Sequence, residues 1–228
     1  MIQEYIEFAK RHPELFSNDQ AMFKLEMDPD EIAAWRDNRR KELADKKLPL
    51  EWADIGIILN DQKILILRDL VEFPDGHKGS YFRVMNQADL RGGQGAVVLP
   101  AMNSKYLLLR QYRHPTRSWS YEVPRGFGEP EVPAEQQAED EVKQETQGDI
   151  AELIDLGIYH SNTGLEGNKV KLYFEKLKSI GKQAQNEGIE SFRWVSLNEL
   201  EKMIATGKIT DGFTIAAYTR AKLRGLLP

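Results

Sequence analysis

Cysteine is absent from this 228-residue sequence, which excludes disulfide bonds, thiol catalysis and zinc–thiolate sites. Long apolar runs are absent too, and none approaches the ~20 residues that a membrane-spanning helix requires. The opening residues Met1-Ile2-Gln3-Glu4 lack the basic and apolar regions of a signal peptide. These absences predict a cytoplasmic protein without a membrane partner.

Positive charge is scarce as well. The 31 Lys and Arg residues are outnumbered by 36 Asp and Glu residues, and the formal net charge is -5. No basic run is longer than Arg39-Arg40-Lys41. Because a nucleic-acid surface needs clustered basic residues against the phosphate backbone, we expect no nucleic-acid partner. With 41% hydrophobic residues, the chain can bury the core of one domain plus an appendage.

The first fifty residues have the periodicity of helices. Apolar residues keep helical spacing over Ile2–Ala9. A second helix is predicted after Asp28 as N-cap, with an apolar stripe that contains Trp35. We therefore predict a helical extension at residues 1–50 and a second domain at residues 51–228. The stripe could pack on that domain or on a second subunit.

From Trp52 onward the apolar pattern changes to that of strands. Trp52–Leu59 and Lys63–Leu70 are apolar and β-branched, and Asn60-Asp61-Gln62 between them predicts a hairpin turn. Further strands are predicted at Tyr81–Asn86, Ala96–Leu99, Leu107–Arg113, Ile154–Tyr159 and Val170–Phe174, and helices at Leu197–Gly207 and Thr214–Leu223.

The stretch Trp119–Gly148 combines a strand, a Pro/Gly loop and an acidic helix. The helix is predicted at Ala134–Thr146, because good helix formers follow a proline without interruption and Gly148 is placed to cap the end. Glu141 and Glu145 are four residues apart and therefore project from the same face. Two carboxylates at this spacing can hold Mg²⁺ or Mn²⁺, but such pairs also occur on solvated helix faces.

This stretch resembles the Nudix box, G-x5-E-x7-R-E-U-x-E-E-x-G-U, in which U is aliphatic. With Gly126 on the first glycine, Glu141, Val142 and Glu145 fall on the E, the U and the last E of the pattern. The preceding YEVPRG is similar to the ELPAG of the ADP-ribose pyrophosphatase branch. The departures are Val132 for Glu, Asp140 for Arg, Gln144 for Glu and Gln147 for Gly.

The resemblance extends over most of the chain from about Trp52, in the order that this branch uses. Gly95–Pro100 is followed by LLLRQYRHP at Leu107–Pro115, then by the box, and then by WVSLNELEKMIATGKITDGFT at Trp194–Thr214. It implies the Nudix fold, an α+β arrangement with a mixed β-sheet between helices, here with an N-terminal helical extension and antiparallel strands. Because the first strands often exchange between subunits in this branch, it also implies a homodimer.

The resemblance implies a metal site. Its ligands would be Glu141, Glu145 and the backbone carbonyl of Arg125. Glu187, in a polar loop after the box, would complete the shell or act as the base for the attacking water. The three glutamates would then form the catalytic set.

The resemblance also implies substrate contacts from Arg113, Glu122, Arg125 and Gly126. Two roles are open for Arg113. Its guanidinium could meet the substrate's diphosphate with paired donors, or it could form a structural ion pair with carboxylates of the box.

The implied reaction is the hydrolysis of the pyrophosphate bond in a nucleoside diphosphate compound such as ADP-ribose, with Mg²⁺ or Mn²⁺ as cofactor. The changed box positions predict weakened activity, since each lost carboxylate lowers the affinity for metal. Two alternatives are a protein that binds a nucleotide sugar without cleaving it and an interaction module that uses residues 1–50. The fold alone does not decide among them.

Overall fold

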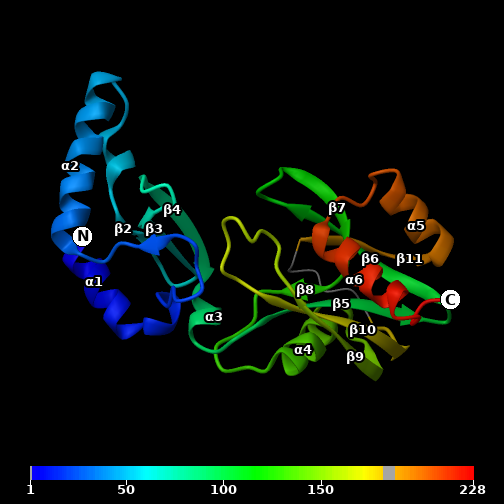
Figure 1. Cartoon of the computed structure of the whole chain (residues 1–228). Coiled ribbons are helices and arrows are strands. Elements are labelled where there is room, and N and C mark those ends of the chain that lie inside the picture. Colours follow the sequence, from blue (N-terminus) through cyan, green and yellow to red (C-terminus); the bar gives the residue numbers. More distant parts are fainter. Residues whose placement is uncertain (1, 182–187) are drawn as a thin grey trace. The chain divides into compact units, whose positions relative to one another are not determined.

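The computed structural model describes residues 2–181 and 188–228 and divides the chain into two compact units (Figure 1). The N-terminal unit comprises Met1–Gln87 and Thr163–Gly167, and the C-terminal unit comprises Ala88–Asn162 and Asn168–Pro228. The division therefore follows Gln87, whereas the sequence places a boundary after residue 50.

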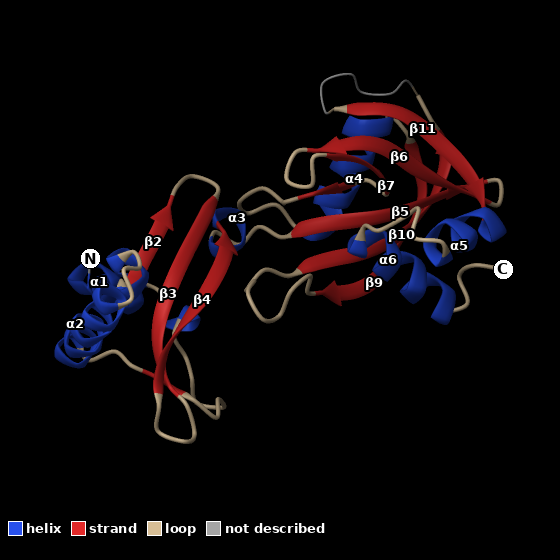
Figure 2. Ribbon diagram, turned by 90° about the horizontal axis from the view of Figure 1, so that it is seen from above, coloured by secondary structure: helices blue, strands red, loops and turns tan. Residues whose placement is uncertain are grey.

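The N-terminal unit is a small antiparallel sheet with two helices. Its elements are α1 (Ile2–Arg11), η1 (Pro13–Leu15), β1 (Lys24–Leu25), α2 (Pro29–Asp45), η2 (Leu50–Ala53), β2 (Gly56–Asn60), β3 (Ile64–Glu72) and β4 (Lys78–Asn86). Strand β3 is central and pairs antiparallel with β1, β2 and β4. Figure 2 shows this sheet with α1 and α2 beside it.

The apolar stripe of α2 packs inside the N-terminal unit. Asp28 caps the helix as predicted, because its side chain accepts hydrogen bonds from the backbone N–H groups of the first turn. Ile32 is fully buried in a cluster with Tyr5 and Leu70, and Trp35 packs against this cluster. The stripe thus covers strands of its own unit.

The predicted strand Trp52–Leu59 is wrong in its first half. Leu50–Ala53 forms the short 3-10 helix η2, and β2 begins only at Gly56. The cause is local, since Pro49 precedes the turn and its carbonyl accepts a hydrogen bond from the Trp52 N–H.

The C-terminal unit has a seven-stranded mixed sheet between helices. Its elements are α3 (Gln87–Leu90), which spans the division, β5 (Gly95–Met102), β6 (Lys105–Arg113), β7 (Ser118–Glu122), β8 (Arg125–Gly126), α4 (Ala134–Thr146), β9 (Asp149–Tyr159), β10 (Val170–Ser179), β11 (Ile189–Ser196), α5 (Leu197–Ala205) and α6 (Gly212–Leu223). The strand order is β11-β6-β5-β10-β9, with β7 paired to β6 and β8 to β5. Only β5 and β10 pair in parallel among the described strands. This arrangement confirms the predicted α+β fold.

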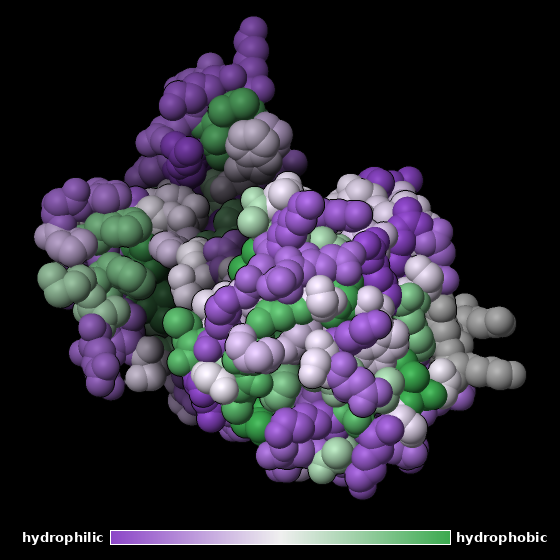
Figure 3. All heavy atoms as spheres, turned by 90° about the vertical axis from the view of Figure 1, so that its right-hand side faces the viewer, coloured by the Kyte–Doolittle hydropathy of each residue, from purple (hydrophilic) through white to green (hydrophobic). Residues whose placement is uncertain are grey.

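Alternate residues of β5 point to the two faces of this sheet. Ala96 and Val98 pack under α4, whereas Val97 and Leu99 pack with residues of α5 and α6. Figure 1 shows α4 on one side of the sheet and α6 on the other. On the face of this unit that is turned to the viewer in Figure 3, apolar and polar residues are mixed.

The end of α4 differs from the prediction in one residue. Gln147, and not Gly148, takes the left-handed conformation at the C-cap, with φ 49°. Gly148 is already leading into β9, and its N–H donates to the hydroxyl of Thr146. Over residues 2–181 and 188–228, no helix has both the length and the apolarity to cross a membrane.

Candidate functional site

Glu141 lies on the side of α4 that faces β8, and Glu145 follows one turn later on the same helix. Glu145 is 2% exposed and Glu141 is half-buried. A Cβ built on Gly126 would lie 1.8 Å from Oε1 of Glu141, so this carboxylate is in contact with the backbone of β8. The first glycine of the box is therefore required for a close approach between strand and helix.

Gln137 orients Glu141. Its Nε2 donates to Oε1 of Glu141 at 2.5 Å, and its own Oε1 accepts from the N–H of Glu129 at 3.2 Å. Because Gln137 bonds to Glu129 as well as to Glu141, this buried side chain also joins the loop before α4 to the helix. Sequence reasoning missed this residue, although its spacing of four from Glu141 is a signal for contact on a helix.

The residues beside β8 fit a hard divalent cation. Glu141 and Glu145 are two carboxylates one turn apart on α4, and Glu141 contacts the backbone of β8 at Gly126. Mg²⁺ commonly takes one or two protein carboxylates and completes its shell with water and substrate phosphate. Among the described residues, no three His, Asp or Glu side chains gather as a metal-binding group. Glu187, the predicted third glutamate, lies outside the described residues.

Glu122 lies between two guanidinium groups on the other side of β8. It ends β7 and is 1% exposed, with Oε1 at 2.5 Å from Nη2 of Arg113 and Oε2 at 3.6 Å from Nη2 of Arg125. Burial raises the pKa of Glu122, while the two arginines oppose that shift. The structure thus gives Arg113 an ion pair, but its partner precedes the box and is not one of the box carboxylates.

Arg125 has two further neighbours that sequence reasoning missed. Its guanidinium carbon lies 4.9 Å from the centre of the Phe213 ring, and its Nη2 lies 3.9 Å from Oδ1 of Asp211. Both neighbours belong to the start of α6. The sequence indicates Asp211 as a helix cap, because it lies three residues before Thr214. The sequence does not indicate its contact with Arg125, which is distant along the chain.

The family model for the NUDIX domain matches residues 91–213. This chain belongs to the Nudix family. The match covers the sheet, the box and the start of α6, and it begins just after the division between the two units.

Comparison with solved structures gives the same fold. A crystal structure of an ADP compounds hydrolase is similar with a TM-score of 0.63 and 14% sequence identity, over 76% of this chain and 93% of that chain. At this identity the likeness concerns the Nudix fold. In a comparison with curated proteins, none matches this chain.

The structure brings the predicted residues of this Nudix unit together in two groups. Glu141 meets Gly126 on the α4 side of β8, with the buried Glu145 one turn further along α4. Arg113, Glu122 and Arg125 lie together near Asp211, the cap of α6. Two of the changed box residues lie on α4, where Gln144 is exposed and Asp140 accepts a hydrogen bond from Gln136 at 3.0 Å. Val132 precedes this helix and Gln147 is its C-cap. Of the two retained glutamates, Glu141 contacts the strand and Glu145 is buried.

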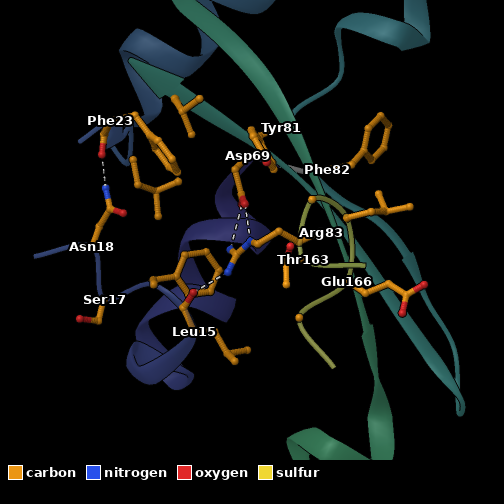
Figure 4. A pocket seen from close by; sticks show the side chains of 16 residues that line it. Leu15, Ser17, Asn18, Phe23, Asp69, Tyr81, Phe82, Arg83, Thr163 and Glu166 are labelled. Carbon is orange, nitrogen blue, oxygen red and sulfur yellow. Dashed lines mark hydrogen bonds and ion pairs between the residues drawn. The ribbon is translucent and has the colours of Figure 1, made fainter. Parts of the chain in front are cut away.

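The N-terminal unit contains a cavity of about 390 Å³ with aromatic walls (Figure 4). Within it, Arg83 pairs with both oxygens of Asp69 and donates to the carbonyl of Leu15. The hydroxyl of Tyr5 also donates to Asp69, at 2.5 Å. Each nitrogen of the Arg83 guanidinium thus donates to a protein oxygen, and the pair joins the α1–η1 segment to β3 and β4.

Proposed function

We propose that this chain is a metal-dependent pyrophosphohydrolase that cleaves the diphosphate of a nucleoside diphosphate compound such as ADP-ribose. The observation that carries the proposal is the contact of Glu141 with Gly126 of β8, with the buried Glu145 one turn further along α4. Membership of the Nudix family supports it, and so does the similarity to a hydrolase of ADP compounds.

In this proposal Glu141, Glu145 and the Arg125 carbonyl hold Mg²⁺ or Mn²⁺. A bound cation of this kind polarises phosphate oxygens and makes water a better nucleophile. Gln137 keeps the Glu141 carboxylate at β8 through its hydrogen bond. We assign the base that prepares the water to Glu187, outside the described residues.

Substrate anions are assigned to the two guanidinium groups. Arg113 and Arg125 keep 27% and 21% of their side chains exposed, whereas Glu122 between them keeps 1%. The accessible part of this group is therefore cationic. Guanidinium groups bind phosphate oxygens with paired N–H donors, which suits a diphosphate.

We expect the activity to be weakened but present. The changed charges at Val132, Asp140 and Gln144 leave the two glutamates Glu141 and Glu145 in place. A chain that binds a nucleotide sugar without cleaving it is the second candidate, and the changed box positions favour it.

We also propose that the protein is a homodimer. Several apolar side chains of β2, β3 and β4 are about two-fifths exposed, namely Ile58, Leu59, Ile64 and Phe82. In such a dimer a second subunit would cover these side chains. A cytoplasmic location and the lack of a nucleic-acid partner stay predictions from the sequence.

The first test measures release of AMP or phosphate from ADP-ribose, other nucleotide sugars, dinucleoside polyphosphates and nucleoside triphosphates, with Mg²⁺, Mn²⁺ or a chelator. We expect metal-dependent release from a nucleotide sugar. Glu145→Gln should lower it by at least about 100-fold, more than loss of an outer-shell partner typically costs.

Glu135→Gln is the matched control, because it removes the same charge from an exposed position on the same helix. Its turnover should stay within about twofold of the native value. Native turnover in Glu145→Gln would remove the metal assignment. Tight binding of a nucleotide sugar without any release would establish the second candidate.

A further inference from the structure

Arg125 is held by charge and ring contacts without a hydrogen bond among the described residues. Its two acidic neighbours, Glu122 and Asp211, lie at 3.6 and 3.9 Å, and Phe213 lies under the guanidinium plane. Its Nε is buried and has no hydrogen-bond partner in the described part of the chain. Since a guanidinium presents five N–H donors, this group retains the capacity to donate to an anion.

Asp211 uses its two carboxylate oxygens differently. Oδ2 accepts from the N–H of Thr214 at 2.8 Å and from its hydroxyl at 2.7 Å, which caps α6. Oδ1 is the oxygen that faces Nη2 of Arg125. A cap needs only the first oxygen and needs no charge, because Asn caps helices as well as Asp does.

Thr214 connects this cap to the link between β7 and β8, just before Arg125. Its side chain is fully buried, and its Oγ1 accepts a hydrogen bond from the N–H of Val123 at 3.0 Å. Val123 follows Glu122 at the end of β7, and Pro124 joins it to the short strand β8. A continuous chain of hydrogen bonds therefore runs from the Val123 backbone through Thr214 to Asp211.

Phe213 completes the arrangement. Its ring meets that of Tyr159 edge-to-face, with centroids 5.8 Å apart and an interplanar angle of 73°. This contact fixes the ring whose face lies against the Arg125 guanidinium.

We propose that the first turn of α6, from Asp211 to Thr214, positions the Arg125 guanidinium for a phosphate oxygen of the substrate. Arg125 makes the contact, and Asp211, Phe213 and Thr214 are positioning residues. The inference rests on the proposed function for the identity of the anion. It goes beyond that function in giving α6 a role in substrate binding.

The placement of Arg125 can be tested without any substrate. Side-chain NMR relaxation of the Arg125 Nε–Hε group should show an ordered group in the native protein. Asp211→Asn keeps the cap but removes the charge, and Thr214→Val keeps the volume but removes the hydroxyl, so both should make this group more mobile. If the Nε–Hε group of Arg125 were as ordered in both variants as in the native protein, the positioning role of Asp211 and Thr214 would be overturned.

Ser196→Ala is the matched control for helix capping. Ser196 accepts from the N–H of Glu199 at 3.3 Å at the start of α5, a different helix from the one that meets Arg125. This variant loses a cap of the same kind and should leave the Arg125 signal unchanged. A change as large as that in Asp211→Asn would mean that general helix stability, and not Asp211, holds Arg125.

Kinetics with ADP-ribose and Mg²⁺ then test the substrate contact. Because the interaction is with bound substrate, Arg125→Ala should raise KM by about tenfold and Asp211→Asn by about threefold, with kcat within about twofold. If Asp211 acts through Arg125, then Asp211→Asn should have no further effect in the Arg125→Ala background. Additive effects would contradict the inference.

Failure of the proposed function can be distinguished from failure of the inference about Arg125. If the native chain neither cleaves nor binds nucleotide sugars, the proposed function fails, and calorimetry with inorganic pyrophosphate tests the anion contact alone. That binding should weaken in both Arg125→Ala and Asp211→Asn by factors similar to those for KM. Native affinity for pyrophosphate in both variants, or none in the native chain, would overturn the inference.

Discussion

At the scale of single residues, Glu175 of β10 is the least expected group in the C-terminal unit. It is fully buried, and neither carboxylate oxygen has a hydrogen-bond partner among the described residues. Burial raises its pKa to about 8, and the negative charge of Glu139 adds to the shift. Glu175 is therefore mainly protonated at neutral pH in the folded chain.

Glu175→Gln should change how stability depends on pH. The folded pKa is above the ordinary value of 4.5, so the native state holds one more proton than the unfolded state between those two values. The contribution of Glu175 is thus fully present below pH 4.5 and is lost as pH rises towards 8, by up to about 1.4 kcal/mol per pH unit. Urea unfolding at pH 6, 7, 8 and 9 should show a flatter profile for the variant.

Glu152→Gln is the control for this experiment, because Glu152 is half exposed on β9 and paired with Lys176. It should keep the native slope, since an exposed pair contributes little. A variant at Glu175 with the native slope would show that this carboxyl is ionised in the folded protein.

At the scale of elements, helix α4 was largely readable from the sequence. Its bounds, Ala134–Thr146, match the prediction, because helix formers run without interruption after Pro133. The pairing of Glu141 and Glu145 on one face follows from the helical period alone. The C-cap was not readable, since Gln147 takes a conformation that glycine usually takes.

Gly126→Ala tests the contact between α4 and β8. The added methyl would lie 1.8 Å from Oε1 of Glu141, so the carboxylate or the strand must move. Because a displacement of about 1 Å at a site can cost about 100-fold in rate, we expect a loss of that order in metal-dependent turnover. Weaker Mn²⁺ binding, measured by electron paramagnetic resonance, should accompany it.

Gly76→Ala provides the comparison, as Gly76 belongs to a turn of the N-terminal unit with φ +84° and open space around its Cβ position. That variant carries backbone strain but should retain turnover and Mn²⁺ binding. If Gly126→Ala also retained both, Glu141 would not be a ligand held by β8.

The start of α6 makes a contact that the sequence pattern does not predict. The helix itself was predicted, although it begins at Gly212, two residues earlier than expected. Its meeting with Arg125 was not predictable, because period and capping patterns describe neighbours along the chain. Contacts between distant segments depend on how the sheet places β8 beside α6.

At the scale of the whole molecule, the same limit explains the domain boundary. The pattern separates helices before residue 50 from strands after it, but it does not tell which strands the helices cover. In the structure Tyr5 and Ile32 share a buried cluster with Ile55 and Leu70 from the strand region. The NUDIX domain match, which begins at residue 91, agrees with a division after Gln87.

Two separate buried clusters predict two separable unfolding transitions. Ile32 is fully buried in the N-terminal unit and Leu172 is fully buried in the C-terminal unit. Replacing either by Ala should cost about 2–5 kcal/mol in its own unit, because it removes buried contacts and leaves a cavity. The effect on the other unit should be small, since substitutions in separate cores are usually independent.

Urea unfolding of variants that keep a single tryptophan measures each unit by itself. Trp35 packs against the cluster of Ile32, and Trp194 lies on β11 in the C-terminal unit. Ile32→Ala should lower the midpoint reported by Trp35 and leave that of Trp194 in place, and Leu172→Ala should do the reverse. If the midpoints reported by both tryptophans moved together in both variants, the two units would unfold as one cooperative body. Helices α1 and α2 would then depend for their stability on the Nudix domain as well as on the sheet of their own unit.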